Sequence, residues 1–354
     1  MSHQNQRALR LAFSSRRLGL LLALGSSGCV PDFNDDLSRI TEPQLLSLRS
    51  TPAEAKGNDE TSLEALVAVP DGQAAPRVEF GLCLARKPLT QLGPINQACL
   101  ERNAPADVLV PLGSGQDARL KLPEDACRLF GPLRPAAEAG KPAGRPVDPD
   151  VTGGFYQPFV ARLGDQVSVG AVRLDCDLSG AGRDDSVKYR QQYRSNENPQ
   201  LARVALSGDA DLDEVATTQV NAGDSVPFDA AWEACPNESS CGDGFCTANE
   251  DQTSCAEDCL EPHGCTGAER YVSYDPEKQA VVARREGITV GWFSSRGHFQ
   301  NEQTGFSEAE AAKATETRNN WSPGNEPGPA TVWLVIRDTR GGQSWKTFHF
   351  EVTP

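Results

Sequence analysis

Eleven cysteines constrain the fold of this 354-residue chain more than any other feature of its sequence. One of them, Cys29, stands apart near the N-terminus. The other ten form two groups, Cys83, Cys99, Cys127 and Cys176, then Cys235, Cys241, Cys246, Cys255, Cys259 and Cys265. Each group has an even number, so in an oxidising compartment two and three disulfides would leave no free thiol. Spacing alone leaves three pairings open in the first group and fifteen in the second.

The N-terminal residues are typical of an export signal. Residues 1–28 contain four arginines and no acidic residue, and the short apolar run 18–24 leads to Gly25-Ser26-Ser27-Gly28-Cys29. A helix needs about 20 apolar residues to cross a bilayer, so this run is too short to be a membrane span. The pattern predicts a signal peptide over residues 1–28.

The small residues before Cys29 resemble the lipobox of bacterial lipoproteins, although Ser26 stands where that family usually has leucine. The resemblance implies that Cys29 takes a diacylglyceryl group and becomes the new N-terminus, with acyl chains such as palmitate holding the protein to the membrane. We therefore expect a lipoprotein of a Gram-negative cell envelope, in the outer membrane, facing either the periplasm or the exterior. The alternative is cleavage by an ordinary signal peptidase, which would leave Cys29 unmodified.

The charge of the chain limits its partners. The formal net charge is −15, and loss of the four arginines in residues 1–28 would take it to about −19. An acidic surface does not make the phosphate contacts that nucleic acids require. Nor is it attracted to anionic headgroups. We therefore expect no nucleic-acid partner, and membrane attachment through lipid chains alone.

The apolar pattern favours strands over helices. The chain has 32 glycines and 25 prolines and no long segment with helical periodicity. The clearest signal lies at the C-terminal end, where residues 331–336 precede a turn at 338–343 and residues 345–352 alternate with period two. This predicts a β-hairpin with one face buried. The sequence as a whole predicts an all-β protein.

Several C-terminal segments carry a resemblance. Trp292-Phe293-Ser294-Ser295, Asn320-Trp321-Ser322-Pro323 and the run 332–338 followed by Gly341-Gly342 resemble the final half of bacterial immunoglobulin-like and PKD-like surface domains. The resemblance implies a β-sandwich that serves as a spacer or a binding module. A tryptophan on a central strand of a sandwich is usually core, so we expect Trp292 and Trp333 to be packing residues.

A short internal repeat predicts two domains of one type. Residues 198–206 are similar to residues 42–48, and each stretch leads through a turn to another strand, although two generic strand starts would also look alike. We expect two immunoglobulin-like sandwiches, the second interrupted by a small disulfide-rich insert. We expect a lipidated flexible spacer at residues 29–40 and a first sandwich at 41–180, which includes a Pro-rich loop at 130–149. A linker with a short helix follows at 181–197. The second sandwich is expected at 198–354, with its insert at 235–265.

The insert carries the sharpest local motif. Cys241-Gly242-Asp243-Gly244-Phe245-Cys246, followed by further acids and cysteines, resembles short Cys-rich modules of secreted bacterial proteins. If Gly244 is the sixth residue of an EF-hand loop, Asp243 is the fifth and Glu250 the twelfth. This suggests a calcium site whose candidate ligands are Asp243, Glu250, Asp251 and Asp258. The alternative is a disulfide knot with solvated acids, because Ser239 and Cys241 hold the first and third positions of the loop, where an EF-hand has carboxylates. Zinc is disfavoured, since oxidation removes the thiolates it needs.

The sequence offers few candidate catalytic residues. After residue 28 the histidines are His263, His298 and His349, and none lies in a recognisable Ser-His-Asp arrangement. We therefore expect a non-catalytic envelope or surface protein, structural or adhesive, that contacts another envelope protein or a glycan and needs no cofactor except possible calcium. The alternatives are a calcium- or glycan-binding surface module, and an envelope hydrolase whose site is assembled from distant residues.

Overall fold

The structure is a computed structural model that describes residues 38–354, apart from residues 71–72, 89, 138–139, 141–143, 179, 208–210, 234–240, 242–249, 252, 257–267 and 309–313. Strands dominate the described chain, which confirms the predicted all-β fold. None of the described helices is long and apolar enough to cross a membrane.

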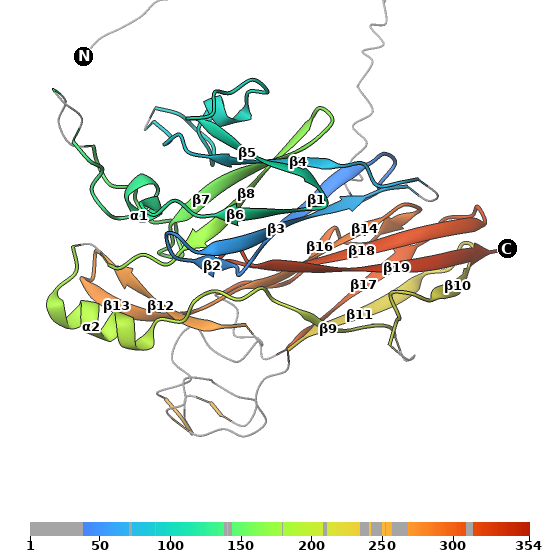
Figure 1. Ribbon diagram of the computed structural model, residues 1–354. Coiled ribbons are helices and arrows are strands. Elements are labelled where there is room, and N and C mark those ends of the chain that lie inside the picture. The colour runs from blue at the N-terminus through green and yellow to red at the C-terminus, as the bar shows by residue number, and fades with distance from the viewer. Residues whose placement is uncertain are drawn as a thin grey trace, which may run out of the picture. The chain divides into compact units, whose positions relative to one another are not determined.

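The first sandwich consists of two sheets (Figure 1). One sheet contains β1 (Gln44–Thr51), β3 (Glu60–Ala68) and β6 (Asp117–Lys121) in that order. The other runs β2 (Glu54–Ala55), β8 (Gln166–Leu174), β7 (Tyr156–Leu163), β4 (Val78–Cys83) and β5 (Leu109–Gly115). Alternate side chains of both sheets, such as Leu63, Phe80 and Phe159, are buried in one core between them.

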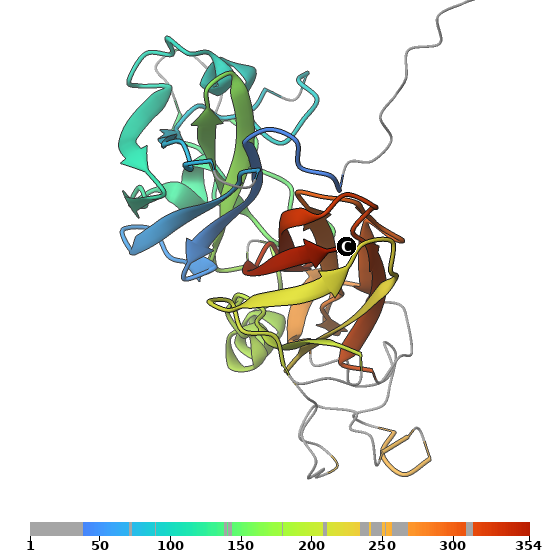
Figure 2. The same ribbon diagram turned by 90° about the vertical axis from the view of Figure 1, so that its right-hand side faces the viewer.

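The second sandwich also has two sheets, and the C-terminus lies at the end of its strand β19 (Figure 2). One sheet runs β15 (His298–Phe299), β17 (Glu316–Ser322), β11 (Val226–Trp232) and β9 (Leu201–Leu206). The other runs β10 (Thr217–Asn221), β19 (Gln343–Thr353), β18 (Gly328–Asp338), β14 (Ile288–Ser294) and β16 (Gln303–Phe306). The ring of Phe228 meets four aromatic rings edge-on in the core, those of Trp292, Phe299, Trp321 and Phe350.

The two sandwiches share one topology. Strands β1 and β9 pair antiparallel with β3 and β11, whereas β2 and β10 lie parallel to β8 and β19 on the opposite sheet. The start of each sandwich is therefore divided between its two sheets, as in immunoglobulin-like domains. The similar stretches 42–48 and 198–206 lead into β1 and β9, which hold the same position in the two sandwiches.

The second sandwich is interrupted between β11 and β14. This connection contains the Cys-rich segment and a hairpin of β12 (Arg270–Asp275) and β13 (Ala280–Arg285), whereas the matching connection of the first sandwich is only residues 69–77. Helix α2 (Arg183–Gln192), in the linker, packs its Tyr189 against the hairpin residues Val272 and Val281. The β12–β13 hairpin is thus covered on one side by the linker.

Strand β18 is buried on both faces, so the prediction of a hairpin with one buried face was wrong for this strand. Val332, Leu334 and Ile336 enter the core of their own sandwich. Trp333 and Val335 point the other way and pack with Ile40, Leu66 and Ala68. The second apolar face is covered by the first sandwich and by the segment that precedes it. Trp292 and Trp333 are both packing residues, but in different cores.

Residues 38–40 form part of the folded body. The Ile40 N–H donates to the Ser294 carbonyl at 2.8 Å, and the Ser294 N–H donates to the Ser38 carbonyl at 2.9 Å. Ile40 is completely buried. The last three residues of the expected spacer are therefore held against β14, and its remaining residues lie outside the described part of the chain.

Arg340, in the turn between β18 and β19, is buried at 0% exposure. Its guanidinium donates through Nε to Glu286 and through Nη2 to Glu269 at 2.7 Å. Its Nη1 donates to the Arg194 carbonyl of the linker at 2.8 Å, and its carbonyl oxygen lies 3.2 Å from the Tyr156 hydroxyl of the first sandwich. Since Glu269 precedes β12 and Glu286 follows β13, one guanidinium clamps both ends of the hairpin.

Three carboxylates share the surroundings of this one cation. Burial, reinforced by the nearby Asp338 carboxylate, raises the pKa of Glu286 to about 8. Burial likewise raises the pKa of Asp338 to about 7. Burial also raises the pKa of Glu269, against the lowering effect of Arg340. The cluster holds more acidic groups than one guanidinium neutralises, so it binds protons more tightly when folded than when unfolded.

Replacement of Arg340 by leucine is expected to lower the free energy of unfolding by about 3–5 kcal/mol, because it removes the donor shared by Glu286, Glu269 and the Arg194 carbonyl in a buried site. Urea unfolding followed by tryptophan fluorescence measures the loss. The control is Arg203→Leu, whose pair with Asp211 is exposed on both sides, at 45% and 65%. Such an exposed pair is worth at most about 1 kcal/mol. Equal losses in the two variants would contradict the role assigned to Arg340.

The substitution Glu286→Gln is expected to flatten the dependence of stability on pH. A carboxyl whose pKa is raised on folding stabilises the fold below its unfolded pKa, and this stabilisation is lost as pH rises through about 8. Calorimetric Tm values at about pH 5.5 and about pH 8.5 should therefore differ less in the variant than in the natural chain. The exposed Glu277→Gln on the same hairpin is the control and should leave the difference unchanged.

Candidate functional site

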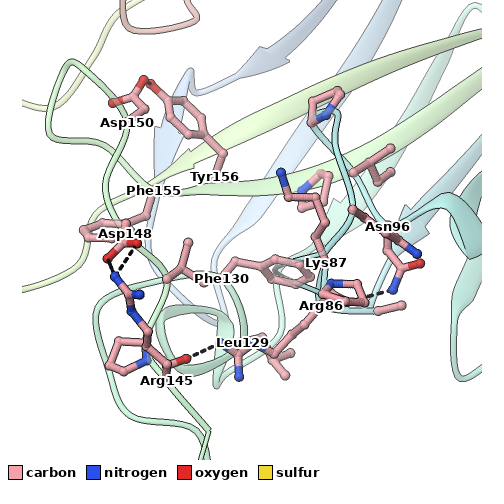
Figure 3. Close-up of a pocket in the computed structure, with 18 of the residues that line it drawn as sticks. Arg86, Lys87, Asn96, Leu129, Phe130, Arg145, Asp148, Asp150, Phe155 and Tyr156 are labelled. Atoms are coloured by element: carbon pink, nitrogen blue, oxygen red, sulfur yellow. Dashed lines mark hydrogen bonds and ion pairs between the residues drawn. The ribbon is translucent and has the colours of Figure 1, made fainter.

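The first sandwich carries a pocket of about 660 Å³, which lies within the usual range of ligand sites (Figure 3). Its walls come from two long connections, residues 84–108 between β4 and β5 and residues 122–155 between β6 and β7. The matching connections of the second sandwich are short, residues 295–302 and 323–327. The pocket is therefore built on features that only one of the two sandwiches has.

The first wall is held by a disulfide and by side-chain hydrogen bonds. Cys83, at the end of β4, is bonded to Cys99 in the short 3-10 helix η1 (Gln97–Leu100). The Asn96 amide accepts the Ala98 N–H at 2.9 Å and donates to the Arg86 carbonyl at 2.7 Å. From β7, the buried Arg162 donates to the Leu100 carbonyl at 2.7 Å. These contacts satisfy the backbone of a connection that has no sheet to pair with.

The second wall is stapled in the same way. Cys127, in helix α1 (Ala126–Leu129), is bonded to Cys176 just after β8. Arg86 reaches across from the first wall and donates to the Arg145 carbonyl at 2.7 Å, as the dashed line in Figure 3 marks. Leu129, the last residue of this helix, and Phe130, its C-cap, line the cavity. The two disulfides and the Arg86 contact hold the walls at a fixed separation.

Asp150 organises the turn where the second wall returns to β7. Its Oδ1 accepts the Thr152 hydroxyl at 2.7 Å and the Gly154 N–H at 2.8 Å, and its Oδ2 accepts the Tyr156 hydroxyl at 3.0 Å. Glycine is required at 154, since a Cβ there would lie 2.0 Å from Arg173 Nη1. Burial raises the pKa of Tyr156 to about 12, so its hydroxyl stays protonated and acts as a donor.

The charges of the pocket are unevenly matched. Asp148 is paired with Arg145 by two contacts of 2.7 Å, and Asp150 is occupied by its own turn. Arg86 and Lys87 donate to main-chain carbonyls, and within the described chain neither forms an ion pair. The lining thus has three cations and two carboxylates, a surplus of one positive charge, on a chain whose formal net charge is −15.

The lining suits binding. Apolar side chains and prolines form much of it, among them Ile95, Phe130, Val147, Pro88 and Pro146. The described lining contains no histidine, cysteine or serine, and both of its carboxylates already accept hydrogen bonds from the protein. An anionic group and apolar groups are the chemistry that this arrangement can hold.

The structure pairs six of the ten predicted disulfide cysteines. Besides the two bridges of the first sandwich, Cys241 is bonded to Cys255 in the insert. Cys235, Cys246, Cys259 and Cys265 lie outside the described residues, as does Cys29. The pairing of the first group is thereby settled as Cys83 with Cys99 and Cys127 with Cys176.

Two of the four candidate calcium ligands, Asp243 and Asp258, lie outside the described residues. Glu250 is 5% exposed. The Asp251 carboxylate accepts the N–H groups of Thr253 and Ser254 at 2.8 and 2.7 Å, which gives it a role in a local turn. Among the described residues no group of three or more His, Cys, Asp or Glu could hold a metal ion.

The histidines and the pocket lie apart in the chain. His298 is on β15 and His349 on β19, both exposed and both in the second sandwich, while His263 lies outside the described residues. Sequence reasoning identified the Pro-rich loop at 130–149 but missed Arg86, Lys87 and Arg145. The available signal was a set of cations close to the first group of cysteines in an otherwise acidic chain.

Comparisons with known proteins do not assign a family. No protein-family model matches the chain, and no curated protein matches it. Solved structures with matching regions include PorU from Porphyromonas gingivalis (12% identity, 88% of this chain and 24% of that chain, TM-score 0.20). They also include the adhesin InvE of Yersinia pseudotuberculosis (10% identity, 86% and 58%, TM-score 0.21) and Escherichia coli α-2-macroglobulin (10% identity, 90% and 22%, TM-score 0.20).

The match spans only about a quarter of the length of PorU (24%) and of E. coli α-2-macroglobulin (22%). At such low TM-scores and identities, the likenesses support no conclusion about function.

The double substitution Cys127→Ser with Cys176→Ser is expected to loosen the second wall. The bridge closes a sequence separation of 49 residues, for which the loss of loop-closure entropy corresponds to about 4 kcal/mol. Hydrogen exchange followed by mass spectrometry should show faster exchange across residues 122–155. The matched control, Cys241→Ser with Cys255→Ser, removes a bridge of the insert and should leave that segment unchanged. Unaltered exchange in the first variant would contradict the stapling role.

Proposed function

We propose that the protein is a non-catalytic, lipid-anchored protein of a Gram-negative cell envelope, in which two fused immunoglobulin-like sandwiches act as an adhesive or structural body. The proposal that the protein is non-catalytic rests on how the polar and charged groups of the pocket are already used. Its carboxylates are committed to ion pairs and turn hydrogen bonds, and its unmatched groups are cations. Such a site binds a ligand but offers no general base or nucleophile to transform it.

The junction supports a mechanical role. Trp333 and Val335 pack on Ile40 and Leu66, and the Arg49 guanidinium lies 4.5 Å from the centre of the Trp345 ring. Arg337 adds a 2.7 Å hydrogen bond to the Leu46 carbonyl. A junction with a buried apolar centre and charged contacts at its edge resists bending better than a bare linker does. A body of this kind suits a protein that holds or contacts something at the envelope.

The position of Ser38 supports the anchor. The described part of the chain begins at Ser38, which is held to β14, and residues 29–37 would join it to a lipid on Cys29. Nine residues span at most about 30 Å when fully extended. The sandwiches would therefore work close to the membrane surface.

Expression of the full chain in a Gram-negative host tests the anchor. Intact mass spectrometry should show a chain that begins at Cys29 and carries acyl groups, and this form should enter the membrane fraction. The variant Cys29→Ser should lack the acyl mass and remain in the aqueous fraction, because acyl chains supply the membrane affinity. An unacylated natural chain, or one cut elsewhere, would refute the lipoprotein assignment.

A further inference from the structure

We propose that the pocket of the first sandwich is a docking site for an extended peptide segment in which apolar side chains flank a carboxylate. This inference goes beyond the lipid anchor and does not depend on it. It rests on four features of the pocket: its unmatched cations, its apolar lining and rim, the internal use of its other polar groups, and its presence in only one sandwich.

The cations select an anionic group. Arg86 and Lys87 make their described hydrogen bonds to neutral carbonyls, at 2.7 Å to Arg145 and at 2.5 Å to Gly93. The buried Nε atom of Arg86 has no hydrogen-bond partner. A guanidinium with unused donors favours a carboxylate, and the charge-assisted bond is strong where water is partly excluded. Because the chain as a whole is acidic, this local excess of positive charge distinguishes the pocket from the rest of the surface.

The apolar residues select side chains next to that anionic group. Ile95 and Phe130 are almost completely buried in the pocket lining. Just beyond the lining, Leu92 is 90% exposed and Val151 is 87% exposed. Each directly follows a residue of the lining in the sequence, Gln91 and Asp150 respectively. An extended segment longer than the cavity would meet these two side chains, whereas a small molecule inside the cavity would not.

The remaining polar groups argue for a peptide over a glycan. The Asn96 amide already holds the Ala98 N–H and the Arg86 carbonyl, and the Tyr156 hydroxyl already donates to Asp150. A glycan presents many hydroxyls that need partners, and unpaired hydroxyls cost free energy when they are desolvated. Prolines along the lining contribute rigid apolar surface without any N–H donor. A peptide with apolar side chains brings fewer hydroxyls into the pocket than a glycan does.

The duplication shows that the pocket is separable from the fold. The second sandwich reaches the same topology with short connections at both matching positions. The long connections of the first sandwich are thus not required to complete the sheets, yet each is fixed by its own disulfide. A ligand held between the two connections would explain why each is fixed by a disulfide and why cations without an ion-pair partner lie between them.

Selection from a library of random displayed peptides on the purified full chain tests the proposal. We expect enrichment of peptides with aspartate or glutamate next to leucine, isoleucine, valine or phenylalanine. Synthetic versions should bind at least tenfold more weakly to the double variant Arg86→Glu with Lys87→Glu, as measured by fluorescence anisotropy. The matched control is Arg102→Glu, a charge reversal on the same connection but outside the pocket lining, and it should bind as the natural chain does.

A second variant guards against misfolding in the first. Leu92→Ser changes a side chain that is 90% exposed, so it leaves the core intact while it should still weaken peptide binding. Enrichment of neutral or basic peptides, or no enrichment, would overturn the proposal. So would equal binding to Arg86→Glu with Lys87→Glu and to Arg102→Glu. Retention of an acidic oligosaccharide such as hyaluronate in place of any peptide, lost in the double variant, would reassign the pocket to a glycan.

Discussion

The guanidinium of Arg340 is the contact on which the arrangement of the β12–β13 hairpin and the linker depends. A buried cation is tolerated only when anions and hydrogen-bond acceptors surround it, and Arg340 finds them on Glu269, Glu286 and the Arg194 carbonyl. These partners come from both ends of the β12–β13 hairpin and from the chain between the sandwiches. The Tyr271 ring completes the site, 4.6 Å from the guanidinium carbon. The β18–β19 turn therefore fixes three segments that the sheets alone would leave loose.

The sandwiches show how one topology carries two different sets of connections. Their strands correspond one to one except for β15, so the sheets themselves do not distinguish them. The connections do. The second sandwich interrupts its β11–β14 connection with the hairpin and the Cys-rich segment, and the first enlarges two other connections into the walls of the pocket. Surface connections tolerate insertion because only their ends are fixed by the sheets.

Much of the fold was readable from the sequence, and the failures have physical causes. Period-two alternation identified the C-terminal hairpin, and the short repeat indicated two sandwiches of one type. Alternation could not show that β18 is covered on both sides, because the side chains on its second face are buried by residues far away in the sequence. The continuous apolar run from Val332 to Ile336 is the pattern of a strand buried on both faces, and it distinguishes β18 from the more alternating β19.

The pocket was harder to predict than the fold. Each wall is fixed to its sandwich by a disulfide, Cys83–Cys99 in one and Cys127–Cys176 in the other, and spacing left that pairing open. The sequence shows Arg86, Lys87 and Arg145 as three similar cations. Only the structure separates Arg145, which is neutralised by Asp148, from the two that are not. The composition of a site can be read from the sequence, but its unmatched charge depends on tertiary contacts.

The disulfides follow the same division between sheets and connections. All three bridges in the described chain lie in connections or at strand ends, and none of them joins the two sheets of a sandwich across its core. The cores are held by apolar packing, as the aromatic cluster around Phe228 illustrates. Long connections cannot bury enough apolar surface to fix themselves, so covalent bonds take that role. An oxidising compartment is therefore a condition for the pocket more than for the sandwiches.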